Sequence, residues 1–211
     1  MRVKGSGKES FSVIVLAGGK GKRLGGNKAL LSFMGRPLIE HVLKRVEELA
    51  EEILIVSDEL KLPFDHPKVL LIPDVFPQGG PLGGIYSGLN ASKNEWAFAF
   101  GCDMPFIQPS VLKLIALVSP GFDAVVPLIG GKPQPLHALY SKSCLEAFRG
   151  DLEKGLLKLT RSLSLLKVRY LSQEEIKAFD PHLISFFNIN SPADLEKALN
   201  LIAQLGNQGK N

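Results

Sequence analysis

The chain of 211 residues is long enough to bury an apolar core of its own without disulfides or a structural metal. Its hydrophobic content of 45% and charged content of 22% are ordinary for a globular protein. The 25 basic and 21 acidic residues leave a formal charge of +4, which fits anionic small molecules as ligands but gives no reason to expect nucleic acid as a partner.

Cysteine use and hydropathy point to the cytoplasm. Cys102 and Cys144 lie far apart without the spacing of metal ligands, which predicts reduced thiols. The apolar run Val13 to Ala17 is too short for the core of a signal peptide, and no run approaches the roughly 18 residues that suggest a membrane span. We therefore expect a cytoplasmic protein that does not bind membranes, with a disordered tail over residues 1–10.

The apolar pattern predicts strands alternating with helices. In the first half we expect a buried strand over 11–17, a glycine loop over 18–27, a helix over 37–50, buried strands over 52–57 and 69–73, a helix over 81–92 and a strand over 96–103. In the second half we expect a helix over 109–118, strands over 123–128 and 134–140, helices over about 141–149 and 153–161, a strand near 166–171, a short helix near 172–178, a strand over 184–190 and a last helix over 192–204.

This order predicts an α/β fold, a single three-layer α/β/α domain with a mostly parallel, Rossmann-like sheet covered by helices on both faces. The prolines in segment 134–140 predict an edge or crossing strand there.

The loop after the first strand combines five glycines with four cations, in the sequence VIVLAGGKGKRLGGNKALL (13–31). Glycines allow close approach of backbone amides to phosphate oxygens, and the carboxyl edge of a parallel sheet is where α/β proteins bind ligands. The cations are Lys20, Lys22, Arg23 and Lys28. Neither the P-loop nor the dinucleotide-binding fingerprint fits, because Asn27 follows Gly26 and position 24 is leucine. The alternatives are a different phosphate loop or a plain flexible turn.

The segment LAGGKGKRLGGNKALL resembles the signature of short-loop nucleotidyltransferases and is most similar to the molybdenum cofactor guanylyltransferase family. Further segments resemble the family pattern in the same order: IPD (72–74), GGPLGGIYSGL (79–89), FGCDMPFI (100–107), QPLHALY (134–140) and FFNINSPADLEKA (186–198). The resemblance implies a nucleotide-diphospho-sugar transferase-like domain over 11–205. Residues 11–105 would be mainly the nucleotide-binding half and residues 106–205 mainly the acceptor half.

The nucleotide site follows from this resemblance. It implies that backbone groups of Leu16, Ala17 and Gly18 read guanine and that the nucleotide-binding set also includes Gly19, Lys28, Asp74, Gly80 and Asp103. Asp74 has the alternative role of a simple turn residue. Asp58 stands where the family often has asparagine, which leaves a ribose or base contact at that position open.

The predicted catalytic residues are Lys28, Arg23 and Asp103. A carboxylate at the end of a buried strand is costly without a cation, and Mg²⁺ binds through one or two carboxylates plus substrate phosphates, so Asp103 is the predicted metal ligand. Its alternative role is a helix N-cap. Lys28 would neutralise charge on the transferring phosphate and Arg23 would act on the departing pyrophosphate. The alternative for Lys28 is a plain surface lysine.

Asn188 and Asn190 lie in the predicted strand over 184–190 and would face one side. The resemblance assigns both to the pterin acceptor, and one of them has the alternative role of a cap or turn. His137 is interpreted as a core or edge histidine rather than an acceptor-pocket residue, and Cys102 as a packed apolar residue.

The expected reaction is transfer of GMP from GTP to the phosphate of molybdenum-molybdopterin with release of pyrophosphate and with Mg²⁺ as cofactor. Alternatives are a cytidylyl or sugar-phosphate nucleotidylyltransferase on the same fold, and a non-catalytic GTP-binding partner of molybdoenzymes. We expect a monomer whose further partners are molybdoenzymes or their chaperones.

Overall fold

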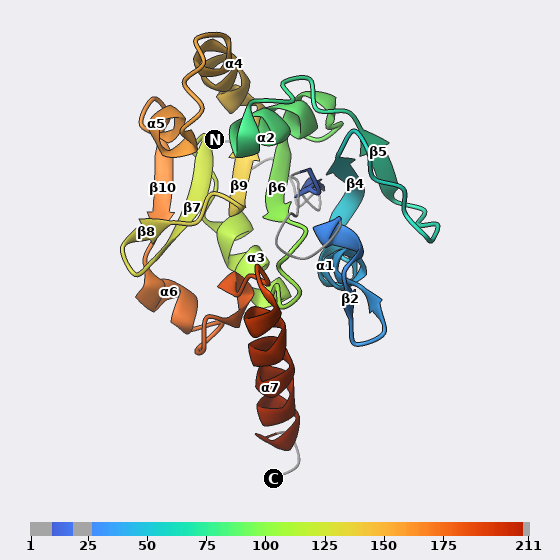
Figure 1. The fold of residues 1–211 in the computed structure, drawn as a ribbon. Helices are drawn as coiled ribbons and strands as arrows, with labels where there is room; N and C mark the ends of the chain where they lie inside the picture. Colours follow the sequence, from blue (N-terminus) through green and yellow to red (C-terminus); the bar gives the residue numbers. More distant parts are fainter. Residues whose placement is uncertain (1–9, 19–26, 209–211) are drawn as a thin grey trace.

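The computed structural model describes residues 10–18 and 27–208. Its main sheet follows the order β10-β7-β9-β6-β1-β4-β5, with the short strand β8 paired to β7 (Figure 1). The strands of this sheet are β1 (Phe11–Leu16), β4 (Ala50–Val56), β5 (Val69–Ile72), β6 (Trp96–Gly101), β7 (Ala124–Ile129), β8 (Lys132–Pro133), β9 (His137–Ser141) and β10 (Val168–Leu171). A separate small sheet joins β2 (Ser32–Phe33) to β3 (Arg36–Pro37).

Helices cover both faces of the main sheet (Figure 1). One face packs against α1 (Leu38–Val46), α3 (Pro109–Leu117) and α6 (Gln173–Lys177). The other face packs against α2 (Gly80–Ala91), α4 (Leu145–Glu153) and α5 (Leu159–Leu163). The remaining helical segments are η1 (Lys28–Leu30), η2 (Lys142–Cys144), η3 (Ile184–Phe186) and α7 (Pro192–Gln208). The predicted fold class, three layers around a mostly parallel sheet, is confirmed.

Strands β8 and β9 depart from the parallel order, and the short β8 pairs antiparallel with β7. Strands β1, β4, β5 and β6 are mutually parallel, whereas β9 runs antiparallel to both of its neighbours, β6 and β7. The sequence predicts an edge or crossing strand here, and the edge alternative is wrong because β9 pairs with a strand on each side. Pro133 and Pro135 both precede the strand, so the ladder from His137 to Ser141 contains no proline and can pair on both sides.

The side chains of β6 alternate in size between the two faces of the sheet. Phe98 and Phe100 point into the core beneath α1 and α3, while Ala97 and Ala99 point towards α2 and α4. The small side chains let α2 lie close to the sheet, and a Cβ atom on Gly84 would lie only 2.7 Å from a methyl carbon of Leu16. The start of α2 is thereby held against the end of β1.

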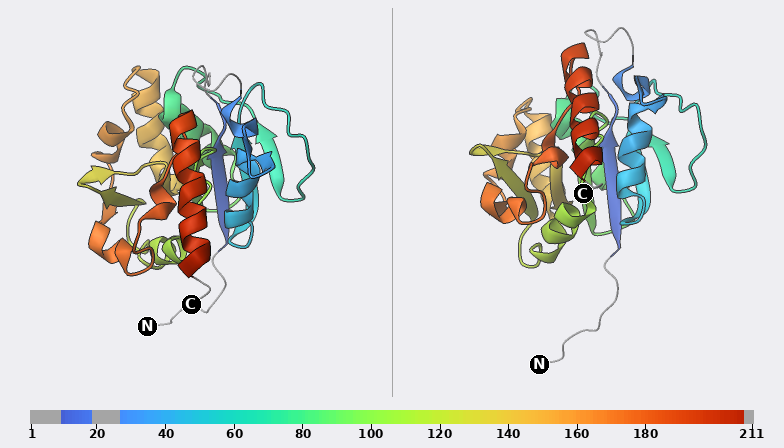
Figure 2. Two further views of the ribbon diagram at one scale, coloured as in Figure 1. Left: turned by 60° about the horizontal axis from the view of Figure 1, so that its bottom comes forward. Right: turned by 90° about the horizontal axis from the view of Figure 1, so that it is seen from below.

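Helix α7 lies beside α1 (Figure 2). It contributes to a third apolar cluster with the small β2–β3 sheet and the segment after β6. The fully or nearly buried members of this cluster are Phe33, Leu38, Phe106, Ile189 and Ala198. The cluster fixes the segment before α7, including residues 188–190, next to the carboxyl end of β6.

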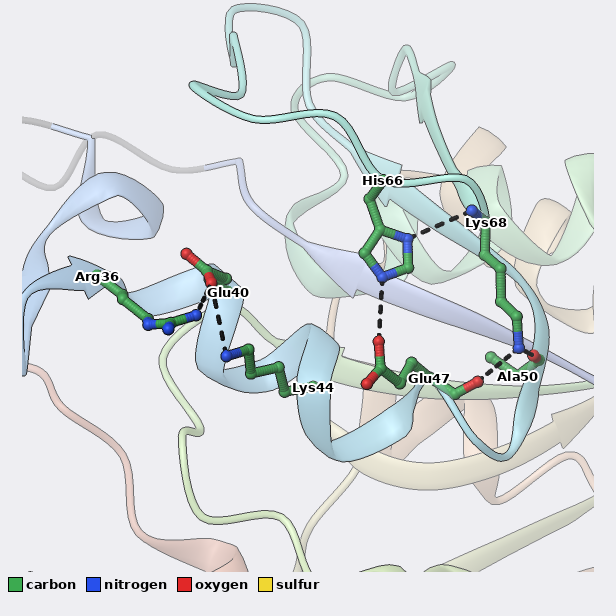
Figure 3. A network of polar contacts seen from close by, with 7 residues as sticks. All are labelled: Arg36, Glu40, Lys44, Glu47, Ala50, His66 and Lys68. Carbon is green, nitrogen blue, oxygen red and sulfur yellow. Dashed lines mark hydrogen bonds and ion pairs between the residues drawn. The ribbon is translucent and has the colours of Figure 1, made fainter.

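A polar network ties the end of α1 to the start of β5 (Figure 3). The Lys68 ammonium donates to the carbonyl oxygens of Glu47 at 2.7 Å and Ala50 at 2.8 Å, so a cation meets the carbonyl end of the helix. His66 accepts from the Lys68 backbone N–H at 3.3 Å, and its Nε2 lies 3.4 Å from the Glu47 carboxylate. These contacts hold the start of β5 next to the end of α1 and the start of β4.

Three further expectations differ from the structure. Strand β5 is not buried, because it is the edge of the sheet and leaves Leu70 and Leu71 each 46% exposed. The predicted helix over 153–161 is broken, since Gly155 adopts a left-handed φ of 69° and α5 starts only at Leu159.

The predicted strand over 184–190 is also absent: η3 begins the segment, and the rest is irregular. The buried Asp180 carboxylate accepts backbone N–H groups of Ile184 at 3.1 Å and Ser185 at 2.9 Å, which bends the chain into a helical turn. In the described part of the chain, no helix combines the length and apolar character needed to cross a membrane.

Candidate functional site

The candidate site is a cleft of about 420 Å³ at the carboxyl edge of the four parallel strands. Each of these strands contributes lining residues from its end: Leu16 and Gly18 after β1, Val56 to Asp58 after β4, Asp74 after β5, and Gly101 to Asp103 at β6. The start of α2 adds Gly80, Pro81 and Gly84, and Lys28, Pro77 and Leu136 complete the lining. Leu136 reaches this edge because β9 is reversed and begins there.

Lys28 stands on a fixed piece of backbone at the end of the glycine loop. The Asn27 side chain accepts the Ala29 N–H at 3.0 Å and caps η1, and the Ala29 side chain is completely buried. From this base the Lys28 ammonium forms an ion pair with the Asp103 carboxylate and donates to Asn190 Oδ1 at 2.7 Å. The alternative of a plain surface lysine does not hold, because its side chain is only 20% exposed and has two partners.

Asp103 follows β6 and points back to the cleft. Its side chain is 17% exposed, and its backbone carbonyl accepts the Ile189 N–H at 3.0 Å, which joins the segment before α7 to the strand end. Asp103 is not a helix N-cap, because that position of α3 belongs to Gln108.

The donor set at Asp103 fits a hard cation that completes its shell with substrate oxygens. Within residues 10–18 and 27–208 no three His, Cys, Asp or Glu side chains gather into a metal-binding group. One carboxylate beside a nucleotide-sized cleft is nevertheless the pattern expected for Mg²⁺, which usually takes one or two protein carboxylates plus phosphates and waters. The site is therefore compatible with Mg²⁺ bound together with a polyphosphate.

Asp74 is held by a short polar chain on the opposite wall. Its Oδ1 accepts the Phe76 N–H at 3.0 Å and the Ser87 hydroxyl at 2.8 Å. Its own N–H donates to Asp58 Oδ1 at 3.1 Å. Asp74 thus closes a turn, as its alternative role required, and also lines the cleft. The sequence left the role of Asp58 undecided. It gave no reason to single out Ser87, which stands out only as a hydroxyl residue in a helix of mainly apolar and small residues.

The end of β1 presents backbone to the cleft while remaining tied to the sheet. The Leu16 carbonyl accepts the Cys102 N–H at 3.2 Å, and the Ala17 N–H donates to the Val56 carbonyl at 3.2 Å. Leu16 and Gly18 line the cleft, whereas the Ala17 side chain is buried. The strand end is therefore positioned rigidly against both of its neighbours.

The two asparagines have different surroundings. Asn190 contacts Lys28, whereas the Asn188 side chain donates to the carbonyl of Phe186 at 3.3 Å and closes a local turn. The expectation that both face one side of a strand is wrong, because the segment is not a strand. Among the other predicted residues, Gly80 lines the cleft, and Gly19 and Arg23 lie outside the described residues.

His137 and Cys102 agree with their structural interpretations. His137 is fully buried between the rings of Phe100 and Phe186, and burial lowers its pKa to about 3. Neither ring nitrogen has a partner among the described residues. Burial, reinforced by the neighbouring Asp103 charge, raises the pKa of the Cys102 thiol to about 12, so it is not a nucleophile near neutral pH.

Comparison with known proteins agrees with this geometry. The MobA-like NTP transferase domain family matches residues 13–168. A probable molybdenum cofactor guanylyltransferase of Natranaerobius thermophilus is 35% identical over 197 residues, which cover 90% of this chain and 95% of the relative. The molybdenum cofactor guanylyltransferase of Desulfosudis oleivorans is 37% identical over 194 residues, again 90% and 95% of the two chains.

A solved structure is similar over the same extent. The crystal structure of molybdopterin-guanine dinucleotide biosynthesis protein A from Archaeoglobus fulgidus superposes with a TM-score of 0.80 at 31% identity and covers 92% of this chain and 99% of that one. The structural similarity therefore extends over most of the chain.

Proposed function

The chain belongs to the molybdenum cofactor guanylyltransferase family of MobA-like NTP transferases and is a nucleotidyltransferase, and we propose that it transfers GMP from GTP to the terminal phosphate of molybdenum-molybdopterin. The products are the guanine dinucleotide form of the cofactor and pyrophosphate. The observation that carries this proposal is the contact between Lys28 and Asp103 in a cleft formed by four parallel strand ends.

The acceptor phosphate is the nucleophile. It is already ionised near neutral pH, so one of its oxygens attacks the α-phosphorus of GTP without a dedicated base. The bond from the α-phosphorus to the oxygen that bridges to the β-phosphorus breaks, and that oxygen leaves with pyrophosphate. The protein's task is to hold two anions together and to stabilise charge on the transferring group.

Lys28 supports this task directly. Lys28 belongs to the end of the glycine loop, which is proposed to bind the nucleotide. Its ammonium contacts Asp103 and also Asn190, which is proposed to lie on the acceptor side. A compact cation at that point can stabilise the negative charge that develops on the transferring phosphate and on the oxygen that leaves with pyrophosphate. Arg23, in the same loop, is proposed to bind the departing pyrophosphate.

The other predicted residues form the two sides of the site. Asp103 would hold Mg²⁺, which would supply positive charge to the polyphosphate. Leu16, Ala17 and Gly18 would read guanine through the backbone, with Gly19, Asp74 and Gly80 completing the nucleotide side. Asn188 and Asn190 are assigned to the pterin side. Delivery to molybdoenzymes or their chaperones, a monomeric state and a cytoplasmic location stay predictions.

The test is a reconstitution with purified components. The protein is incubated with molybdenum-molybdopterin, Mg²⁺ and one of GTP, CTP or UTP, and the pterin dinucleotide and pyrophosphate are quantified. Product from GTP alone supports the proposal. Product from CTP alone would replace it with cytidylyl transfer, and GTP binding without any product would leave only a binding partner.

Thermal unfolding gives an independent reading of nucleotide choice. A nucleotide that binds only the folded state stabilises it by about 2.7 kcal/mol at a hundredfold excess over its Kd. GTP with Mg²⁺ should stabilise the protein to this extent, and CTP and UTP should stabilise it less at the same concentration.

A further inference from the structure

Ser87 is a buried polar residue in the middle of α2 with no part in the proposed reaction. Its side chain is 2% exposed, and its hydroxyl oxygen contacts three groups. It lies 3.0 Å from the Val75 N–H, 2.8 Å from Asp74 Oδ1 and 2.8 Å from the Gly83 carbonyl. Two of these three partners belong to the turn that follows β5 rather than to its own helix.

The hydroxyl has one hydrogen to give. The Val75 N–H can only donate, so the Ser87 oxygen accepts from it. The single hydroxyl hydrogen then goes to the Asp74 carboxylate or to the Gly83 carbonyl, and the ionised carboxylate is the stronger acceptor. Since Asp74 Oδ1 also accepts the Phe76 N–H at 3.0 Å, two donors from different directions fix one carboxylate oxygen.

The turn also packs tightly on α2. A Cβ atom on Gly83 would lie 2.6 Å from the Phe76 carbonyl oxygen, so only glycine permits this approach. The Phe76 ring meets the Tyr86 ring edge to face, with centroids 5.3 Å apart. The turn around Asp74 and the start of α2, which lines the cleft through Gly80 and Pro81, are therefore one rigid unit.

We propose that Ser87 is a positioning residue that sets nucleotide affinity by fixing the Asp74 carboxylate against the cleft. The inference rests on the proposed function in that Asp74 contacts the nucleotide. Ser87 itself touches no substrate, because it lies beneath the turn, and it acts on the nucleotide only through Asp74.

The experiment measures GTP binding by isothermal titration calorimetry in the presence of Mg²⁺. The variants are Ser87→Ala, Asp74→Ala, the double variant, and Ser92→Ala as a matched control. Ser92 is a buried serine at the end of the same helix, 4% exposed, whose hydroxyl donates to the Leu89 carbonyl at 2.9 Å outside the cleft.

We expect Ser87→Ala to weaken GTP binding by about fivefold, the change that one hydrogen bond of ordinary net strength corresponds to. Ser92→Ala should destabilise the fold without changing the Kd. In the Asp74→Ala background, Ser87→Ala should cause no further loss, because its route to the nucleotide is gone. In steady-state kinetics, Ser87→Ala should raise KM for GTP and leave kcat within twofold.

The inference is wrong if Ser87→Ala binds GTP like the wild type, or if its loss is the same with and without Asp74. Ser87→Cys, nearly equal in volume but a weaker donor, repeats the test if the alanine variant fails to fold. A wild-type protein that binds CTP in place of GTP would overturn the proposed function, and the same series with CTP would then test Ser87.

Discussion

Lys28 and Asp103, which lie 75 positions apart in the sequence, are ion-paired in the cleft. Each charge thus compensates the other, which avoids the cost of leaving a largely buried charge alone. When a polyphosphate and its cation enter, each can exchange its partner in the protein for one of opposite charge on the ligand. The ion pair is therefore the target of most of the substitutions predicted below.

Removing either charge should abolish most of the activity. Asp103→Asn and Lys28→Met keep approximate shape, and we expect each to lower kcat by about a hundredfold to a thousandfold, the usual effect of removing one group that stabilises transition-state charge. The measurement is pterin dinucleotide formation under saturating GTP. Glu40→Gln, which removes the charge that pairs with Arg36 and Lys44 at the surface, is the control and should keep full activity. Retention of activity within threefold in either cleft variant would contradict the assigned roles.

Lys28 should also compete with a metal ion for Asp103. Without nucleotide, we expect Lys28→Met to bind Mn²⁺, a spectroscopic substitute for Mg²⁺, more tightly than the wild type, because a neighbouring positive charge has been removed. Electron paramagnetic resonance of free Mn²⁺ measures the affinity. Asp103→Asn should remove the tighter binding. Equal Mn²⁺ affinity in wild type and Lys28→Met would show that the metal does not use this carboxylate.

Asn190 should matter for the chemical step and Asn188 should not. Asn190→Ala removes the 2.7 Å hydrogen bond to the Lys28 ammonium, and a bond to a charged group justifies an expected loss of about tenfold in kcat. Asn188→Ala leaves Lys28 untouched and should alter only KM for the pterin. The comparison needs kcat and KM for both substrates. An unchanged kcat in Asn190→Ala would separate Asn190 from Lys28.

His137 should make the fold sensitive to acid. Its pKa is about 3 in the folded protein because of burial, against about 6.5 when exposed, so between these values the unfolded chain binds a proton that the folded chain does not. The free energy of unfolding therefore falls as the pH drops below about 6.5, with a slope from this group of up to about 1.4 kcal/mol per pH unit.

Urea unfolding at several pH values between 7 and 4 tests this directly. His137→Leu should flatten the dependence of stability on pH, whereas His182→Leu, at an exposed histidine, should leave it as in the wild type. An unchanged slope in His137→Leu would mean that this ring is not the source of the acid sensitivity.

Local patterns predicted the nucleotide side of the fold well. Runs such as Val13–Val15 and the alternation of Phe and Ala in β6 are direct consequences of burial in the sheet. Asp103 after β6 and Asp74 after the edge strand β5 both line the cleft. The second half was harder, because its geometry depends on partners remote in sequence. Nothing within β9 says that it is inserted antiparallel between β6 and β7.

The segment over 184–190 was wrongly predicted as a strand. A nearby side chain sets its actual conformation, and that conformation brings it into contact with a residue remote in sequence. Asp180 bends the chain through its side chain, which an apolar pattern does not register, and α7 then holds Asn190 against Lys28 across 162 positions. Ser87 was missed for a similar reason, since a serine inside a helix looks neutral until the turn it supports is seen.

The contact between Lys28 and Asn190 also orders events during synthesis. A growing chain emerges from the ribosome with its amino end first, and early segments can fold before late ones exist. The glycine-loop lysine is made near the beginning, but one of its two partners arrives only with the last tenth of the polypeptide. A chain that ends before residue 190 therefore lacks the hydrogen bond that Asn190 accepts from the Lys28 ammonium.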